Sequence, residues 1–160
     1  MDHHEILGPV TPKKLYGIVA LAEMITWAGL IIGMVLKYSD TTEALMPVVG
    51  LVHGVAFLSY ALVTVFVWVN QRWSFGRGAM GLATAIIPFA TLPFERNAEK
   101  NGLLDGDWRL VPGGETPHTV PEKIQAWALA RPLVAVAVGV VGVAAVTAIL
   151  LIIGPPVPKD

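Results

Sequence analysis

The sequence predicts an all-α membrane protein with four transmembrane helices, and its composition and charge distribution support this fold class. Of its 160 residues, 54% are hydrophobic and only 14% are charged, and the mean hydropathy is +0.64. A soluble domain carries about a quarter charged residues. The charges are also clustered, which leaves four long stretches almost free of them. Stretches of this length and composition are typical of helices that cross a bilayer.

The first stretch, residues 15–36, follows a polar tail over residues 1–14 and is interrupted only by Glu23. As a helix it would extend about 33 Å, enough for a hydrocarbon core of about 30 Å. The second stretch, residues 45–69, contains one ionisable residue, His53. Only a short polar segment separates the two, so we expect an antiparallel hairpin. Basic and aromatic residues mark the interfaces at its ends.

The third stretch, residues 76–94, is shorter, and Pro88 and Pro93 near its end predict a kinked or unwound last turn. We expect it to span the membrane and complete a three-span core over residues 15–104. The alternative is a re-entrant segment covered by neighbouring helices.

Residues 105–132 are rich in Gly and Pro and predict an extramembrane loop, with a short interfacial helix from Pro121 to Arg131 as one option. Residues 133–154 carry no charge and predict the fourth transmembrane helix, before a tail over residues 155–160. With four spans, five Lys and Arg residues lie on one side and six on the other. This balance leaves the orientation open.

Glu23 and His53 are the only ionisable residues deep in an expected span. Such residues are costly in lipid and often mark proton or ion pathways, but a structural hydrogen bond between helices is the more economical interpretation. The hairpin register places the two about one turn apart in depth. We therefore expect local partners: Ser59 or Tyr60 for Glu23, and Thr26 or the indole of Trp27 for His53.

Small residues recur four apart in every stretch, a spacing that allows close approach of helix backbones. They are expected to mediate helix packing and comprise Gly29 with Gly33, Gly50 with Gly54, Gly81 with Ala85, and Ala135 with Gly139.

Several classes of function are disfavoured. The net charge of −1 argues against a nucleic-acid partner. The chain has no Cys, and only one His lies at depth, so neither a metal site nor a haem site is expected. No nucleophile–base arrangement or carboxylate cluster is visible, so we predict no catalytic activity. No cofactor is expected; a bound phospholipid is compatible with the sequence.

The first three stretches resemble a small bacterial integral-membrane family of uncharacterised function, common in high-GC Gram-positive bacteria. The resemblance covers about residues 12–104 and rests on a Glu-x-x-Thr-Trp motif, a His-Gly-x-x-Phe-x-x-Tyr motif and a later proline segment: Glu23, Thr26, Trp27, His53, Gly54, Phe57, Tyr60 and Pro88 to Thr91. It implies a multi-pass protein of the bacterial plasma membrane, with the fourth span as an addition. It supplies no catalytic residues.

We therefore expect a non-catalytic accessory subunit whose partners are other membrane subunits and the lipid bilayer. One candidate host is the respiratory supercomplex that joins a cytochrome bcc complex to an aa-type oxidase in the electron-transport chain. The alternative is a small proton or cation transporter that uses Glu23 and His53. The few polar residues per span and the lack of internal repeats argue against a transporter.

Overall fold

The computed structural model describes residues 10–154, and within this range the chain is entirely helical apart from its turns and loops. The predicted tails over residues 1–9 and 155–160 lie outside the described residues. Three helices are long and apolar enough to cross a membrane, namely α1 (Pro12–Tyr38), α2 (Met46–Gln71) and α6 (Pro132–Ile153). Three shorter helices complete the fold: α3 (Phe75–Thr84), α4 (Thr91–Lys100) and α5 (Val120–Ala130).

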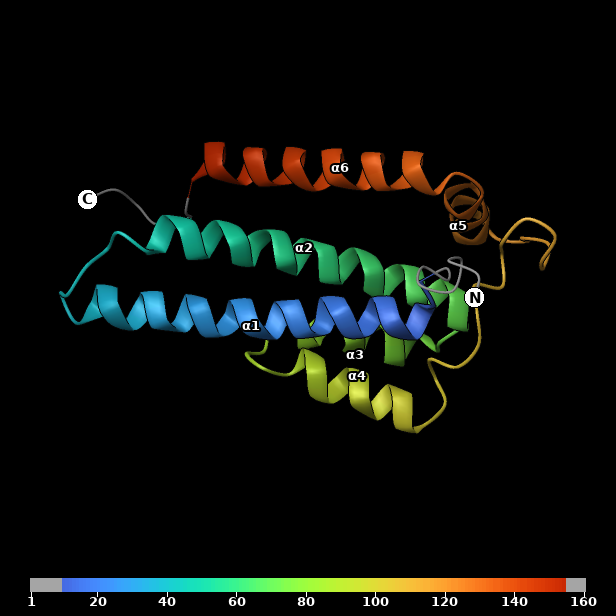
Figure 1. Ribbon diagram of the computed structural model, residues 1–160, viewed down its shortest axis with the longest axis horizontal. Coiled ribbons are helices and arrows are strands. Elements are labelled where there is room, and N and C mark those ends of the chain that lie inside the picture. The colour runs from blue at the N-terminus through green and yellow to red at the C-terminus, as the bar shows by residue number, and fades with distance from the viewer. Residues whose placement is uncertain (1–9, 155–160) are drawn as a thin grey trace, which may run out of the picture.

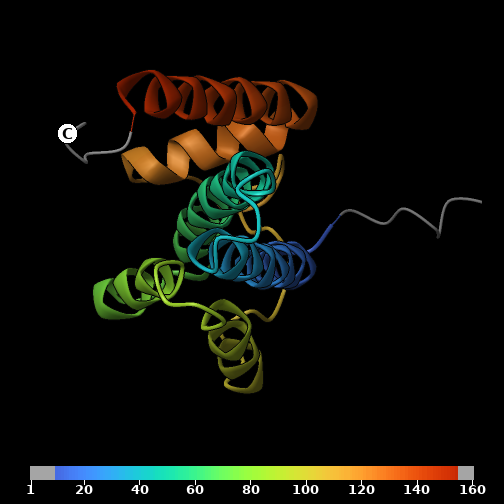
Figure 2. The ribbon, with the colours of Figure 1, turned by 90° about the vertical axis from the view of Figure 1, so that its left-hand side faces the viewer.

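Helices α1 and α2 form the expected antiparallel hairpin at the centre of the molecule. The Thr11 hydroxyl caps α1 by accepting from the Lys14 amide, and Pro residues occupy the first turn of both helices. Arg72 ends α2 in the left-handed conformation, with φ of 52°. Figure 2 shows the hairpin between α5 and α6 on one side and α3 and α4 on the other.

The third stretch does not form one spanning helix, and the expected four spans are not confirmed. Residues 85–90 interrupt it, because Pro88 and Pro93 cannot donate the backbone hydrogen bonds that a continuous helix requires. The resulting helices α3 and α4 have 10 residues each. Each is therefore about 15 Å long, half of what a bilayer crossing needs.

Helices α3 and α4 instead form a re-entrant hairpin beside α1 and α2. Figure 1 shows α3 leaving the end of α2, a turn near the middle of α1, and α4 returning to the end where α1 begins. An ion pair of 2.7 Å between Lys13 Nζ and Glu99 Oε1 fixes the end of α4 beside the start of α1. The re-entrant alternative is thus the one that the structure adopts.

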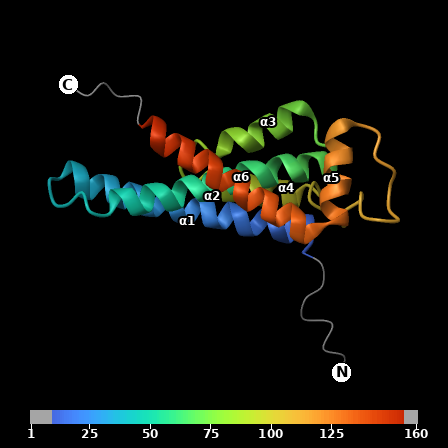
Figure 3. The same cartoon turned by 90° about the horizontal axis from the view of Figure 1, so that it is seen from above.

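The segment that follows contains the short helix that was one option for residues 121–131. Helix α5 begins with a capping box in which Thr119 and Glu122 each bond the other's backbone amide. In Figure 3, α5 runs across the ends of the long helices, and α6 then turns back along α2. Helix α6 corresponds to the predicted fourth span, residues 133–154, and both starts and ends one residue earlier than predicted.

Candidate functional site

A hydroxyl network joins α1, α2 and α3 inside the molecule. The Tyr16 and Tyr60 hydroxyl oxygens are 2.8 Å apart, and both side chains are fully buried. The Tyr60 hydroxyl also lies 2.9 Å from Thr84 Oγ1, and Thr84 donates to the Gly81 carbonyl at 2.7 Å. Thr64 donates to the Tyr60 carbonyl. Of these polar residues only Tyr60 was expected at the site, and its predicted partner Glu23 is not among those it binds.

Glu23 is fully buried against the re-entrant hairpin. Its Oε2 atom lies 3.5 Å from Thr91 Oγ1, and Thr91 donates to the Ala20 carbonyl at 3.0 Å. Its Oε1 atom has no hydrogen-bond partner among the described residues. Thr91 is the first residue of α4, so the carboxyl group sits at the amino end of that helix, where the helix dipole favours negative charge.

The expected partners of Glu23, Ser59 and Tyr60, are thus replaced by Thr91. Ser59 is half-buried and forms no side-chain hydrogen bond among the described residues. The physical reason is the re-entrant hairpin, which brings α4 to the depth of Glu23. A third helix running straight across the membrane would not place Thr91 there.

His53 and Thr26 form the pair that the hairpin register predicted, with 3.1 Å between Nδ1 and Oγ1. The Thr26 hydroxyl donates its single proton to the Glu23 carbonyl at 2.9 Å, so the His53 Nδ1 atom must be the donor in this pair. The Trp27 ring lies 4.6 Å from the His53 ring, but its indole donates to the Ala85 carbonyl at 3.2 Å. Trp27 therefore holds the end of α3.

The small residues divide into those that contact another helix and those that do not. A Cβ atom at Gly33 would lie 2.8 Å from Val49 Cγ2, and Gly29 faces the same side chain. At Gly139 it would lie 3.7 Å from Leu62. At Gly50 or Gly54 it would meet no atom within 4 Å from the described residues, apart from the chain neighbours and the backbone of α2 itself. Contrary to expectation, the Gly50–Gly54 pair does not pack against another helix of the described chain.

Arg109, which was not among the expected site residues, joins the loop to the end of α2. Its Nε atom donates to the Asn70 carbonyl at 2.7 Å and its Nη2 atom to the Val69 carbonyl at 2.9 Å. The same guanidinium binds Glu122 at 2.6 Å and Glu115 at 3.2 Å. A cation at a helix carboxyl end is stabilising. A single Arg in a Gly- and Pro-rich loop gives no sequence signal for this role.

Hydrogen bonds and ion pairs at this end of the molecule lower the pKa of two acidic side chains. Hydrogen bonds from the His118 amide, the Arg109 guanidinium and the Thr119 amide lower the pKa of Glu122 to about 2. The hydrogen bond from Lys13 lowers the pKa of Glu99. Among the described residues, no three His, Asp or Glu side chains gather closely enough to hold a metal ion. The buried polar groups join helices to one another.

Comparison with known proteins identifies the family to which this architecture belongs. Residues 13–100 match the model of a domain of unknown function, DUF3817. The chain belongs to this family. The match covers α1 to α4, so α5 and α6 lie outside the DUF3817 core.

Two relatives are both described as membrane proteins. A Streptomyces coelicolor protein is 42% identical over 88 residues, which are 54% of this chain but only 10% of that protein. An uncharacterised Bacillus subtilis protein is 33% identical over 67 residues, which are 42% of this chain and 70% of that protein. No solved structure matches the chain. Together with the three apolar helices, these relatives establish a multi-pass membrane protein.

Proposed function

We propose that this protein is a non-catalytic accessory subunit of a larger membrane assembly, and that helices of a partner subunit cover the tip of its re-entrant hairpin. The tip consists of Ile86, Ile87, Pro88 and Phe89, between α3 and α4. The observation that carries this proposal is the exposure of irregular backbone at mid-membrane depth.

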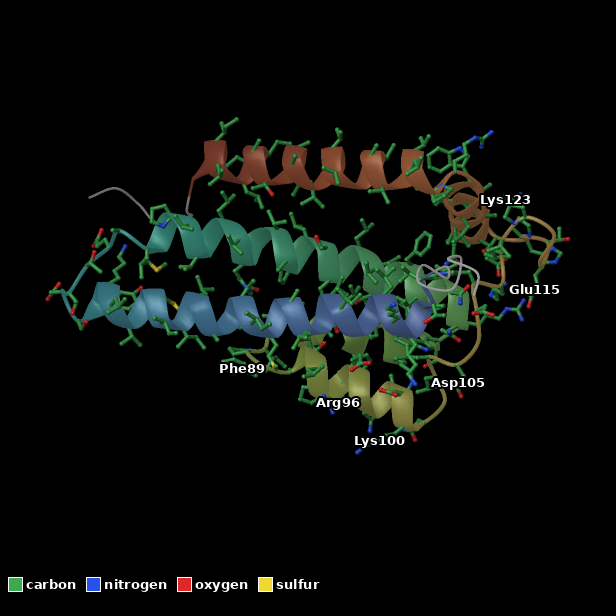
Figure 4. The ribbon with its side chains drawn as sticks, viewed as in Figure 1. Phe89, Arg96, Lys100, Asp105, Glu115 and Lys123 are labelled. Atoms are coloured by element: carbon green, nitrogen blue, oxygen red, sulfur yellow. The ribbon has the colours of Figure 1, made fainter. Side chains whose placement is uncertain are left out.

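The depth of the tip follows from its contacts with α1. Trp27 donates to the Ala85 carbonyl, and Thr91 donates to the Ala20 carbonyl. The tip thus lies level with the middle of α1, which extends from Pro12 to Tyr38. Figure 4 places Phe89 halfway along the bundle. For a bilayer that encloses α1 and α2, this position is the hydrocarbon centre.

The tip is not covered by the rest of the chain. Ile86 is 69% exposed, Ile87 56% and Phe89 43%. Phe89 adopts a φ of 62°, and its amide has no backbone partner among the described residues. An unsatisfied backbone group in hydrocarbon costs several kcal/mol, so irregular backbone at this depth occurs only where protein or a water-filled cavity surrounds it. The apolar side chains of the tip favour protein.

The sizes of the two relatives support a module that works with other parts. The matched region makes up most of the Bacillus subtilis protein and a tenth of the Streptomyces coelicolor protein. A structural module can occur alone or within a larger chain. We propose the bacterial plasma membrane as the location of this protein, and the supercomplex of cytochrome bcc and an aa-type oxidase as the candidate assembly that contains it.

Site-specific photo-crosslinking in cells tests the partner. A benzophenone amino acid at Ile86 is expected to give a protein–protein product with a different membrane subunit, identified by mass spectrometry. The same group at Ile25, which is 60% exposed near the middle of α1, is the control at matched depth and is expected to give lipid adducts. Lipid adducts alone at both positions, or a product with a second copy, would contradict the proposal.

Absorbance spectroscopy of the tagged protein, purified in mild detergent, tests the host. Haem bands that co-purify are expected for a respiratory assembly. A crosslinked partner in a colourless preparation would exclude this host and retain the accessory role.

One observation favours transport as a second candidate function. The Glu23 Oε1 atom is buried without a hydrogen-bond partner in the part of the chain that the structure describes, and it could bind a proton or a cation. Liposome flux of wild type is then compared with that of Glu23→Gln, which keeps the size of the side chain and removes its charge. Equal flux from the two proteins excludes this function.

A further inference from the structure

Helix α5 turns three of its large apolar side chains away from the protein. Val120, Ile124 and Trp127 recur on one helical face and are 68%, 61% and 40% exposed. On the opposite face, Gln125 donates to the Phe66 carbonyl at 2.9 Å, and Glu122 binds Arg109. This distribution is the reverse of that on a helix at the surface of a soluble domain.

Helix α5 also lies where a membrane surface would be. It runs across the spans at their ends in Figures 1 and 3, and α6 begins at Pro132, just after α5 ends at Ala130. A helix across the spans lies parallel to the membrane plane. An outward apolar face with a Trp is typical of helices that bind the headgroup region.

The re-entrant hairpin decides which membrane face this is. Because α4 returns to the side where α1 begins, the loop and α5 lie on that side too. Nine of the ten Lys and Arg residues in the described chain are then at this end: Lys13, Lys14, Arg72, Arg77, Arg96, Lys100, Arg109, Lys123 and Arg131. Among residues 10–154, Lys37 alone is at the other end. An excess of this kind marks the cytoplasmic side, whose leaflet carries anionic lipids.

Two of these cations flank the apolar face of α5. Lys123 and Arg131 are exposed, and neither forms an ion pair within residues 10–154. Figure 4 shows Lys123 at the outer end of the molecule. By contrast, Lys13, Arg72 and Arg109 are paired with Glu residues. The unpaired cations of α5 are therefore available for an external anion.

We propose that the outward face of α5, formed by Val120, Ile124 and Trp127 with Lys123 and Arg131, binds anionic phospholipid headgroups of the cytoplasmic leaflet. The apolar side chains enter the boundary between headgroups and acyl chains. The two cations contact the phosphates. This binding is independent of the partner proposed for the hairpin tip, which lies at mid-membrane depth.

Lipid retention by the purified full-length protein tests the binding. Native mass spectrometry is used to compare retained phosphatidylglycerol with retained phosphatidylcholine. Each cation near the surface contributes about a fivefold preference, so Lys123→Gln with Arg131→Gln is expected to lower phosphatidylglycerol retention about 25-fold. The control Lys37→Gln, at the other end, is expected to leave retention unchanged. Wild-type retention in the double variant, or no preference in wild type, overturns the proposal.

Two further measurements test whether the outward face of α5 contacts lipid and whether α5 lies on the cytoplasmic side. A benzophenone amino acid at Ile124 is expected to give lipid adducts in cells, and a protein adduct would show that a subunit covers α5 instead. The chain contains no Cys, so Thr41→Cys and Asp107→Cys each introduce a unique thiol. An impermeant maleimide is expected to label Thr41→Cys in intact cells and Asp107→Cys only after lysis. The reverse result overturns the cytoplasmic assignment.

Discussion

The DUF3817 core and helix α6 are both apolar, yet they are held in place in different ways. In the core, hydrogen bonds between helices connect Tyr16, Tyr60 and Thr84, and Thr91 connects α4 to α1. Helix α6 buries no residue. Its four partly covered residues, Ala135, Gly139, Val143 and Thr147, form one stripe at a spacing of four.

This difference shows what fixes helix positions in a membrane. Burial of apolar surface gives no net gain between helices there, because lipid is equally apolar. Hydrogen bonds and close contacts therefore define the arrangement of the core. The stripe of partly covered residues holds α6 by van der Waals contact alone. Most of the surface of α6 stays free for lipid or other helices.

Glycine substitutions are expected to change the free energy of unfolding most differently in the DUF3817 core and in α6. A Cβ atom at Gly78 would overlap the Trp68 ring, and the Trp68 indole is fixed by its bond to the Trp73 carbonyl at 2.9 Å. Gly78→Ala should lower the free energy of unfolding by about 1–3 kcal/mol, the usual cost of overpacking. Thermal unfolding in detergent measures this change.

The matched variant in α6 is Gly142→Ala, where a Cβ atom would meet nothing within 4 Å. Its free energy of unfolding should stay within about 0.5 kcal/mol of wild type. Equal destabilisation by both variants would show that the two regions are packed alike.

A smaller effect is expected from the hydroxyl network. Tyr60→Phe removes contacts with Tyr16, Thr84 and the Gly81 carbonyl. The expected loss is about 1–2 kcal/mol, because hydrogen bonds between membrane helices contribute modestly. The control is Tyr38→Phe, at the exposed end of α1. If the Tyr60→Phe protein is as stable as this control, the close packing of side chains stabilises the core and the hydroxyl hydrogen bonds do not contribute.

The smallest effect concerns the loop that joins the two regions. Because the pKa of Glu122 is lowered from 4.5 to about 2, its bonds to Arg109 and the loop stabilise the fold fully above about pH 4.5. This stabilisation falls as the pH drops from 4.5 through 2. Thermal unfolding from pH 6 to pH 2 should show a steeper decline in wild type than in Glu122→Gln, in which only other acidic groups such as Glu99 still contribute. Glu43→Gln, in the other loop, should retain the wild-type profile.

The spans of the hairpin and α6 could be predicted from the sequence because hydrophobic length alone determines them. For residues 76–94 the sequence left a crossing and a re-entrant segment both open, and the apolar composition favoured the crossing that the structure does not contain. Two local features exclude a continuous spanning helix over these residues. Pro88 and Pro93 lack amide protons, and Thr84 and Thr91 form hydrogen bonds with α2 and α1.

The candidate site was predictable only where it depended on the register of one hairpin. His53 with Thr26 follows from that register, whereas Glu23 with Thr91 depends on a fold-back 68 residues away. Tyr16 and Thr64 could have been found, because Tyr16 lies seven residues before Glu23 and Thr64 four after Tyr60, on the same helical faces. The role of Arg109 left no pattern to detect.

The re-entrant hairpin also determines whether the number of membrane crossings before residue 104 is even or odd. The core contains two candidate spans, α1 and α2, and α4 returns to the end where α1 begins. With two crossings, residue 104 would lie on the same face as residue 12. A polypeptide joined at residue 104 would stay in the compartment from which the core started. Helix α6, the third candidate span, would make the number of crossings odd and would carry residue 154 to the opposite compartment. Reporters fused after these two positions would therefore be active on different sides of one membrane.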